Sequence, residues 1–384
     1  MRFSVDAHAI GRHLTGNEVY VKNLLRGFAA LDTSSEFVAY LSEPDAAREI
    51  PERFLARYVA PNPFLRLGYD LTSRLRKDRP DLIHVQYTAP LNCPVPVVVS
   101  VHDISFVDHP EFFPLARVAQ LRVTVERTIR RAAAVLTPSE FSRREILCRY
   151  QVDPEKVKAI PNAVSAEFRP RSHEQASALV RERFGIPAPF ILTVGDLQPR
   201  KNQTGLIRAF EELIAAHPGL PHHLVIVGKE SWKGAQVRRR AQSSPAKERI
   251  HLTGFVSDEE LKWLYAACEI FVFPSFYEGF GLPILEAMAS GRAVACSNAT
   301  AVPEVADACA ILFDPTSTRD MTLAMRDLLL DAELRGRIER LGIQRAAAYS
   351  WRSTAAQTLE VYYEVAARRA AARPLAEKSV PVSR

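Results

Sequence analysis

The chain has 384 residues, of which 47% are hydrophobic, and a formal net charge of +6. This length and composition suit a globular α/β protein with two hydrophobic cores. The basic residues are spread along the chain without interleaved aromatic residues, which argues against nucleic-acid binding and leaves an anionic substrate or an anionic membrane surface as partners.

The first half of the chain reads as strands and helices in alternation. Residues 17–31 place Val21, Leu24, Leu25 and Phe28 on one side, as an amphipathic helix does. The other predicted elements are strands at 2–6, 81–86, 95–102 and 134–137, a helix at 115–131, and a further helix opened by Thr137-Pro-Ser-Glu.

A second set of elements follows a stretch of proline, asparagine, arginine and serine residues at 161–172. After a small helical insert, the predicted strands are 190–194, 224–227, 250–253 and 270–273, and the predicted helices are 203–217 and 258–268. Strands separated by helices of this length form right-handed βαβ units with a parallel sheet. The sequence therefore predicts two Rossmann-like domains, at 1–170 and 171–350, and a C-terminal segment at 351–384.

The most informative segment is the run PSFYEGFGLPILEAMASG at 274–291, directly after a predicted strand. The run breaks at Gly279 and Gly281 and then enters a helix with Pro283 in its first turn. The unpaired N–H groups and the dipole of a helix start favour a bound anion. Glu278 and Glu286 bracket the turn. A phosphate site with carboxylates on either side for hydroxyl groups describes a nucleotide-sugar pocket.

This run resembles, nearly residue for residue, the core motif of retaining glycosyltransferases of family 4. Ser275, Tyr277, the Gly-Phe-Gly-Leu-Pro turn and the Glu-Ala-Met-Ala segment are all present. The resemblance implies the GT-B fold, in which two Rossmann-like domains with parallel sheets face each other across a donor cleft. It also implies that a helix at about 351–368 crosses back onto the first domain, ahead of a disordered tail from Pro374.

A second motif, from Gly195 to Asn202, follows a predicted strand and precedes a predicted helix. Arg200 offers a planar fork of donors and Lys201 a point charge, at the carboxyl end of a parallel strand, where α/β proteins bind ligands. The corresponding segment binds the donor diphosphate in family 4 enzymes. Many members carry arginine directly after the glycine, where this chain has Asp196, and we expect Arg200 to supply that guanidinium.

Other candidate residues lie at the ends of predicted strands and helices. His102 ends a strand, and the resemblance places it beside the donor sugar. Gly16 opens the first helix, where a glycine loop of the family lies under the diphosphate or the acceptor; a plain helix cap is the alternative. Gly228 and Lys229 follow a strand and are expected to border the nucleobase. Glu304 stands at another helix start, where structural capping is the favoured interpretation and a direct ligand contact the alternative.

The segment 64–77 is amphipathic, with Gly68 interrupting its helical pattern. Its apolar side holds Phe64, Leu67, Leu71 and Leu75, and its basic residues are Arg66, Arg74, Arg76 and Lys77. Two interpretations remain open: a surface helix packed on the first domain, which is the favoured one, or a contact with an anionic membrane.

The sequence thus predicts a retaining, metal-independent glycosyltransferase that moves a sugar from a nucleoside-diphosphate donor to a hydroxyl of a glycan or polyprenyl-diphosphate-linked acceptor. The predicted catalytic residues are Glu278 at the sugar, Arg200 and Lys201 at the departing diphosphate, and His102. By family likeness, Glu286 accepts from the ribose hydroxyls. The remaining predicted donor-binding residues are Gly279, Phe280, Gly281, Leu282, Gly16, Gly195, Gly228 and Lys229.

The Pro-Arg-Lys-Asn ending of the second motif resembles bacterial polysaccharide mannosyltransferases, which makes mannose from GDP-mannose the predicted transfer, in surface polysaccharide synthesis. No cofactor and no metal site is expected. A nucleotide-sugar-binding protein or an epimerase of the same fold remains an alternative. A dehydrogenase needs Gly-x-Gly-x-x-Gly, and Ile284 breaks that pattern.

The five cysteines are scattered, without Cys-x-x-Cys spacing, which argues against a disulfide framework or a zinc site and for a reducing compartment. The N-terminus lacks the apolar run of a signal peptide, and no apolar run approaches 18 residues. We therefore expect a cytoplasmic protein, with peripheral contact at the inner face of the membrane as one role for the segment 64–77.

Overall fold

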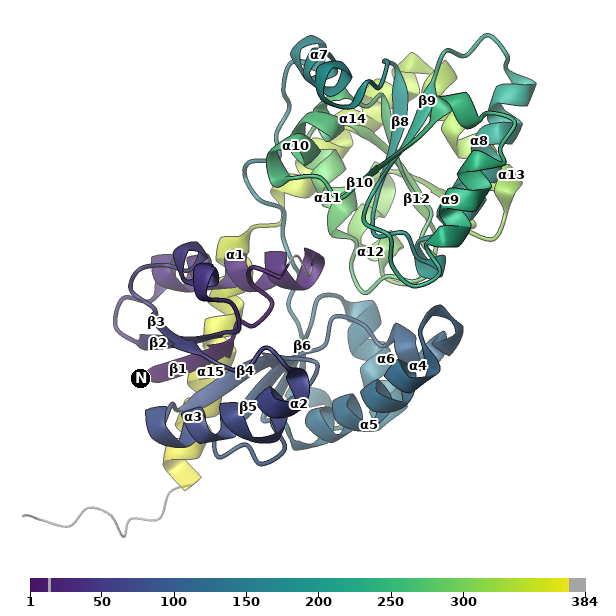
Figure 1. Ribbon diagram of the computed structural model, residues 1–384. Helices are drawn as coiled ribbons and strands as arrows, with labels where there is room; N and C mark the ends of the chain where they lie inside the picture. Colours follow the sequence, from purple (N-terminus) through teal and green to yellow (C-terminus); the bar gives the residue numbers. More distant parts are fainter. Residues whose placement is uncertain (13–14, 373–384) are drawn as a thin grey trace, which may run out of the picture.

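The structure, a computed structural model, describes residues 1–12 and 15–372. These residues form two α/β units, each built on one parallel sheet with helices on both faces (Figure 1). The predicted disordered tail from Pro374 lies outside the described residues. The two sheets span 2–159 and 190–313. The division at 170 and 350 stays a prediction.

The first sheet has seven parallel strands. In spatial order they are β3 (Leu55–Tyr58), β2 (Glu36–Leu41), β1 (Arg2–Asp6), β4 (Leu82–Gln86), β5 (Val97–Ser100), β6 (Ala134–Thr137) and β7 (Val157–Ala159). Its helices are α1 (Thr15–Leu31), α2 (Pro63–Leu65), α3 (Leu71–Asp78), α4 (Ser105–Asp108), α5 (Leu115–Arg131) and α6 (Glu140–Tyr150). Phe3, Val5 and Leu24 belong to the core on one face of this sheet, and Val85, Val99 and Ile129 to the core on the other.

The second sheet has six parallel strands. In spatial order they are β10 (Ile250–Gly254), β9 (His223–Val227), β8 (Phe190–Val194), β11 (Ile270–Phe273), β12 (Ala293–Ser297) and β13 (Ile311–Phe313). Its helices are α7 (His173–Phe184), α8 (Gln203–Ala216), α9 (Ala235–Gln242), α10 (Asp258–Ala267), α11 (Leu282–Ala289), α12 (Val302–Ala306), α13 (Thr318–Leu330) and α14 (Ala332–Ala347). The inner strands β8, β9, β11 and β12 are almost fully buried between helices, as a parallel sheet requires, whereas the edge strands β10 and β13 are partly exposed.

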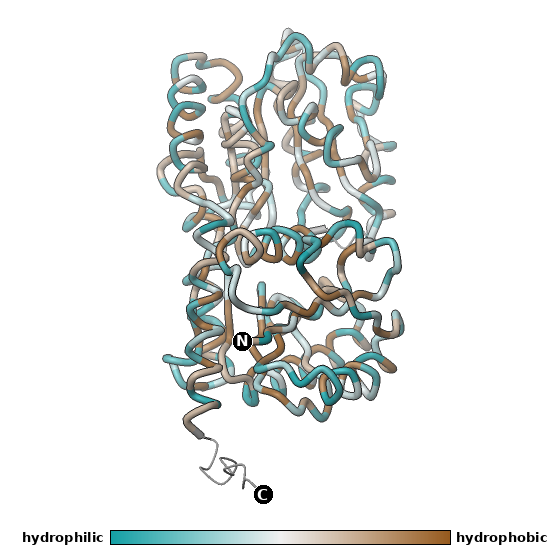
Figure 2. The backbone as a smooth tube through the Cα atoms, turned by 90° about the vertical axis from the view of Figure 1, so that its left-hand side faces the viewer, coloured by the Kyte–Doolittle hydropathy of each residue, from teal (hydrophilic) through white to brown (hydrophobic). Residues whose placement is uncertain are grey.

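The last helix, α15 (Trp351–Ala372), leaves the second unit and packs against α1 and β4 of the first. Figure 2 shows it running along one side of the lower unit. Tyr362 fills the core there, with its ring 5.2 Å from that of Phe3. Its hydroxyl also lies 2.6 Å from His84 Nδ1 of β4. The chain therefore ties its two units together twice, once through the 161–172 linker and once through this helix.

The predicted strands at 2–6, 134–137, 190–194 and 270–273 and the helix at 115–131 are confirmed with the same bounds. The strand predicted at 95–102 is shorter, at Val97–Ser100, and it begins after Pro96, which lacks the N–H group that a ladder needs. The strands β2, β3, β7, β12 and β13 were not predicted from the sequence. Three of them, β3, β7 and β13, are only three or four residues long and lie at a sheet edge, where the apolar signal is weak.

The segment 64–77 does not form one amphipathic helix. A π-helical turn at Arg66–Asp70 separates α2 from α3. Leu71 and Leu75 are buried in the first unit, as the favoured interpretation predicted. Two details were wrong. Arg66 is 5% exposed and lies 3.7 Å from buried Asp6, so it is no membrane contact, and Phe64 is 76% exposed rather than packed. No helix in the described part of the chain is long and apolar enough to cross a membrane.

Candidate active site

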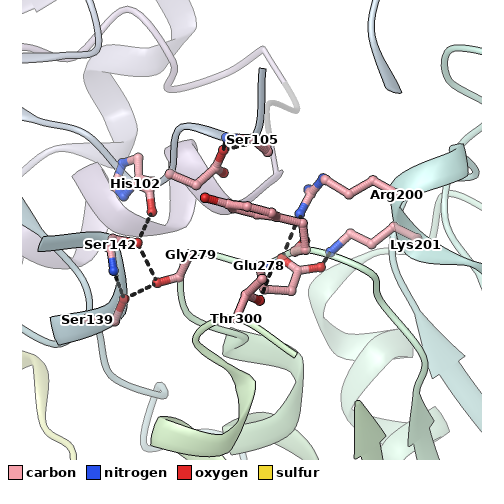
Figure 3. A network of polar contacts seen from close by, with 11 residues as sticks. His102, Ser105, Ser139, Ser142, Arg200, Lys201, Glu278, Gly279 and Thr300 are labelled. Carbon is pink, nitrogen blue, oxygen red and sulfur yellow. Dashed lines mark hydrogen bonds and ion pairs between the residues drawn. The ribbon is translucent and has the colours of Figure 1, made fainter. Parts of the chain in front are cut away.

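The candidate site lies where loops after β5 of the first unit meet loops after β8 and β11 of the second (Figure 3). The contact between the two backbones is close. A Cβ atom added to Gly279 would lie 1.8 Å from the carbonyl oxygen of His102, so only glycine fits there. The carboxyl ends of parallel strands therefore meet across the interface, at the place where α/β folds bind ligands.

A buried cluster of three charges forms the centre of the site. Arg200 NH1 lies 2.9 Å from Glu278 Oε2, and Lys201 Nζ lies 2.7 Å from Glu278 Oε1. Burial raises the pKa of Glu278, but the two cations outweigh that effect and lower the pKa to about 2. Burial lowers the pKa of Lys201, and Glu278 only partly offsets it. The cluster thus places one carboxylate and a net positive charge beside the start of α11.

Local structure fixes the two cations. Pro199–Lys201 form one turn of 3-10 helix, and Asn202 then turns left-handed at φ 52° before α8 begins. The Asn202 side chain donates to Pro315 O at 2.7 Å, and Phe276 N donates to Arg200 O at 2.9 Å. The predicted basic motif is therefore held to the β11 loop by its own backbone as well as by its side chains.

Two predicted donor-site glycines meet at the ends of β8 and β9. Gly228 has φ 149°, and a Cβ there would lie 2.1 Å from Gly195 O. The residue after it, Lys229, accepts at its carbonyl oxygen from Leu197 N at 2.9 Å. These contacts bring the two strand ends close beside Lys201, whose side chain lies 3.2 Å from a Cβ built on Gly195.

Glu286 lies inside α11, about one turn after the helix start, as the motif predicted. Gly281 caps this helix at φ 114°, Leu282 is its first residue, and Pro283 is second rather than first. The buried hydroxyl of Tyr265, from α10, donates to Glu286 Oε2 at 2.9 Å. Burial raises the pKa of Glu286 to about 7, despite this hydrogen bond. The carboxyl therefore changes charge near neutral pH.

His102 extends beyond β5 toward the second unit. Its Nε2 lies 3.1 Å from Gln86 Oε1, and its ring packs edge-on against Tyr20 and Tyr87 at 4.8 and 5.7 Å between centroids. Burial lowers its pKa to about 4. The imidazole is therefore neutral at pH 7, and because Gln86 Oε1 can only accept, Nε2 carries the proton.

Not every predicted residue presents its side chain to this site. Phe280 is 5% exposed, and its ring packs inside the second unit against Tyr349. Only its backbone is therefore available to the candidate site. Gly16 is exposed near the start of α1, with open space around it. Within the described ranges, no group of three or more His, Cys, Asp or Glu side chains could hold a metal ion.

The structure adds residues that the sequence reasoning missed. Ser139 Oγ and Ser142 Oγ, at the start of α6, both donate to Gly279 O. Thr300 Oγ1 accepts from Glu278 N at 3.0 Å. Glu304, assigned to capping its own helix, instead accepts from two backbone N–H groups of α6. The sequence marked Ser139 as a helix start but carried no signal for contacts across the interface.

The chain is similar to glycosyltransferases of known families. Residues 180–345 match the family described as Glycosyl transferases group 1, and residues 14–168 match Glycosyltransferase Family 4. The chain is 32% identical over 265 residues to O-antigen chain mannosyltransferase B of Escherichia coli, and the match covers 69% of each protein. It is 33% identical over 251 residues to the MMP alpha-(1->4)-mannosyltransferase of Mycolicibacterium hassiacum, covering 64% of this chain and 57% of that protein.

Solved structures give the same fold. Sucrose-phosphate synthase from Thermosynechococcus elongatus superposes with a TM-score of 0.77 at 18% identity, over 96% of this chain and 100% of that one. Anabaena Alr3699/HepE in complex with UDP and glucose superposes with a TM-score of 0.75 at 19% identity, over 94% and 99%. The two parallel-sheet units have the GT-B fold. The chain belongs to the group 1 glycosyltransferases, family 4.

Proposed function

We propose that this glycosyltransferase moves mannose from GDP-mannose, with retention of anomeric configuration, to a hydroxyl of a glycan or polyprenyl-diphosphate-linked acceptor in surface polysaccharide synthesis. The choice of mannose is supported by relatives about one-third identical that are named mannosyltransferases. The observation that carries the chemistry is the buried cluster of Arg200, Lys201 and Glu278 beside a helix start.

The cluster suits the departure of a diphosphate. Negative charge grows on the leaving group as the glycosidic bond breaks, and Arg200 and Lys201 stabilise that charge in a site shielded from water. Glu278 holds both cations and faces the sugar hydroxyls. Glu286 accepts from the ribose hydroxyls. Neutral His102, whose one N–H group is donated to Gln86, accepts from a sugar hydroxyl at Nδ1 from the opposite unit. In this proposal, Arg200, Lys201 and the start of α11 stabilise the negative charge of the diphosphate, without a metal ion.

Donor screening tests this proposal. The purified protein is incubated with GDP-mannose, UDP-glucose, UDP-galactose and dTDP-sugars, with oligosaccharide acceptors, and the released nucleotide is measured. GDP released only from GDP-mannose, with an α-linked product by NMR, supports it. Release of a different nucleotide would show that GDP-mannose is not the donor. A product with inverted anomeric configuration would contradict the retaining mechanism. Binding without release in every combination would favour the alternative, a nucleotide-sugar-binding protein or an epimerase.

Metal dependence is measured in the same assay. Activity should survive excess EDTA, because the diphosphate is held by Arg200, Lys201 and the start of α11. Activity that EDTA abolishes and Mg²⁺ or Mn²⁺ restores would contradict the assigned roles.

A lipid-linked acceptor would bring the protein to an anionic membrane. Three apolar side chains on one stretch of surface support such a contact: Phe64, Leu65 and Tyr69 are 76%, 62% and 74% exposed. A cavity of about 480 Å³ nearby is lined by Arg76, Arg127 and Arg131. Leu91, which also lines this cavity, contacts the segment 64–77, since its N–H group donates to Leu67 O at 3.0 Å. Apolar anchors beside arginines suit a surface of anionic lipid.

A further inference from the structure

The contacts at the start of α6 use the opposite unit to complete a helix cap. An isolated helix start leaves its first N–H groups unpaired. Here Glu304 Oε1 accepts from Glu140 N at 2.8 Å and Oε2 from Phe141 N at 3.0 Å. Ser139 Oγ accepts from Ser142 N at 3.1 Å, as an ordinary cap does. Two of the three first N–H groups of α6 are therefore satisfied by a carboxylate from the second unit.

The same serines hold the donor loop in return. Ser139 Oγ donates to Gly279 O at 2.7 Å, and Ser142 Oγ lies 3.3 Å from both Gly279 O and His102 O (Figure 3). Ser139 and Ser142 are 0% and 2% exposed, so water does not compete for these bonds. We call the four residues Ser139, Ser142, Gly279 and Glu304 the interdomain clasp.

The second unit presents its half of the clasp on rigid backbone. Arg345 NH2 donates to Glu304 O at 2.7 Å and Arg345 Nε donates to Val305 O at 3.0 Å, which fixes α12 against α14. Gly279 directly follows Glu278, whose side chain is held by both cations and whose N–H donates to Thr300. A displacement of α6 relative to Gly279 therefore acts on the charged cluster through one peptide unit.

We propose that Ser139, Ser142 and Glu304 are positioning residues that lock the two units in the arrangement where His102 and the 278–282 loop face one sugar. This inference rests on the proposed function for its catalytic consequence. Donor binding residues lie mainly on the second unit, so loss of the clasp leaves donor affinity intact. The transferred sugar then lacks groups from the first unit, and the chemical step slows.

Three variants test the clasp. Glu304→Ala removes both cross-unit caps, Glu304→Gln keeps one acceptor oxygen, and Ser142→Ala removes a hydroxyl while leaving the Ser139 cap in place. Glu304 is exposed, so its replacement leaves both cores intact. The matched control is Ser317→Ala, which removes the N-cap of α13 at 3.1 Å from Asp320 N and touches only the second unit.

The expected result is a split between turnover and binding. Glu304→Ala and Ser142→Ala should lower kcat at least tenfold with donor Kd changed less than twofold, and Glu304→Gln should fall between Glu304→Ala and the wild type. Small-angle scattering should give a larger radius of gyration for Glu304→Ala. Ser317→Ala should lower Tm by a few degrees with kcat and radius unchanged, because a lost cap weakens only its own helix.

Two outcomes would overturn the clasp: clasp variants whose kcat and radius match those of Ser317→Ala, or variants that lose donor affinity in proportion to kcat. A wild type that turns over no donor would instead refute the proposed function. The scattering comparison still decides the clasp in that case, since it needs no substrate.

Discussion

At the residue scale, Lys201 combines burial, charge and an aromatic neighbour. Its Nζ lies 2.7 Å from Glu278 Oε1 and 5.0 Å from the centre of the Phe273 ring. If it stabilises the departing diphosphate, Lys201→Ala should lower kcat by about 10²-fold or more, comparable to the loss of one oxyanion donor. Steady-state kinetics with the donor identified by screening measure this effect. Lys247→Ala, an exposed lysine of the same unit, is the control. A raised KM with unchanged kcat would assign Lys201 to ground-state binding only.

Glu286 gives the donor site a pH dependence. Its folded-state pKa of about 7 lies above the ordinary value of 4.5, because the carboxyl is buried. Ribose hydroxyls bind the ionised form, so donor affinity should rise as pH increases from about 5 to 8, with proton release on binding below pH 7. Each hydrogen bond to a charged group contributes roughly 1.5–3 kcal/mol, so Glu286→Ala should weaken the donor about tenfold or more at pH 8.

The stability of the free protein should change in the opposite direction. Because the folded-state pKa is raised, the stabilisation from protonated Glu286 is fully present below about pH 4.5 and is lost as pH rises through 7. Glu286→Gln removes this decline, and its donor Kd should be independent of pH between 5 and 8. Thermal unfolding at a series of pH values measures the change in stability. Calorimetric titration in buffers of different ionisation enthalpy measures the donor Kd and the proton release. A wild-type Kd that stays constant over this range would contradict the assigned role.

At the element scale, the packing of α15 on α1 depends on one glycine. A Cβ on Gly27 would lie 2.4 Å from Ala355 Cβ and 3.3 Å from Trp351 O. Alanine normally favours a helix over glycine, but here Gly27→Ala should destabilise the protein by about 1–3 kcal/mol, the usual effect of overpacking. Thermal unfolding measures the change. Ala355→Gly in the same chain should recover part of it, and an additive double variant would show that the two helices do not meet there.

Elements with a strong local signal were predicted well. α5 runs over the predicted 115–131, and β11 over the predicted 270–273, because long periodic segments and short apolar runs bounded by turns carry their own pattern. The interruption at Arg66–Asp70 was not predicted, although Gly68 lowered the expectation of a continuous helix. Arg66 turns inward there to meet Asp6, and a charge that pairs inside the fold looks in sequence like any surface arginine.

At the scale of the whole molecule, a net charge of +6 and the exposed apolar residues bear on membrane binding. Binding to phosphatidylglycerol vesicles should be weak and salt-sensitive, since each basic residue near the surface contributes about 1 kcal/mol and screening removes it. Replacement of Arg74, Arg76 and Lys77 together with Gln should abolish sedimentation while donor binding stays intact. In a separate variant, Phe64→Ser with Leu65→Ser should remove the residual binding that the wild type keeps at high salt, because apolar contacts are not screened. Equal sedimentation of wild type and triple variant at low salt would contradict the contact.

The sequence by itself determined the class of fold and the chemical inventory of the site. The strand–glycine–helix run at 274–291 and the basic block ending at Asn202 are local patterns, so the family and the candidate residues could be read directly. Only the tertiary structure decided which residues of the two units contact each other. Glu304 caps a helix 164 positions away in sequence, and Ser139 bonds a carbonyl 140 positions away. Such contacts depend on how the two sheets are arranged relative to each other, and no local pattern of residues encodes that arrangement.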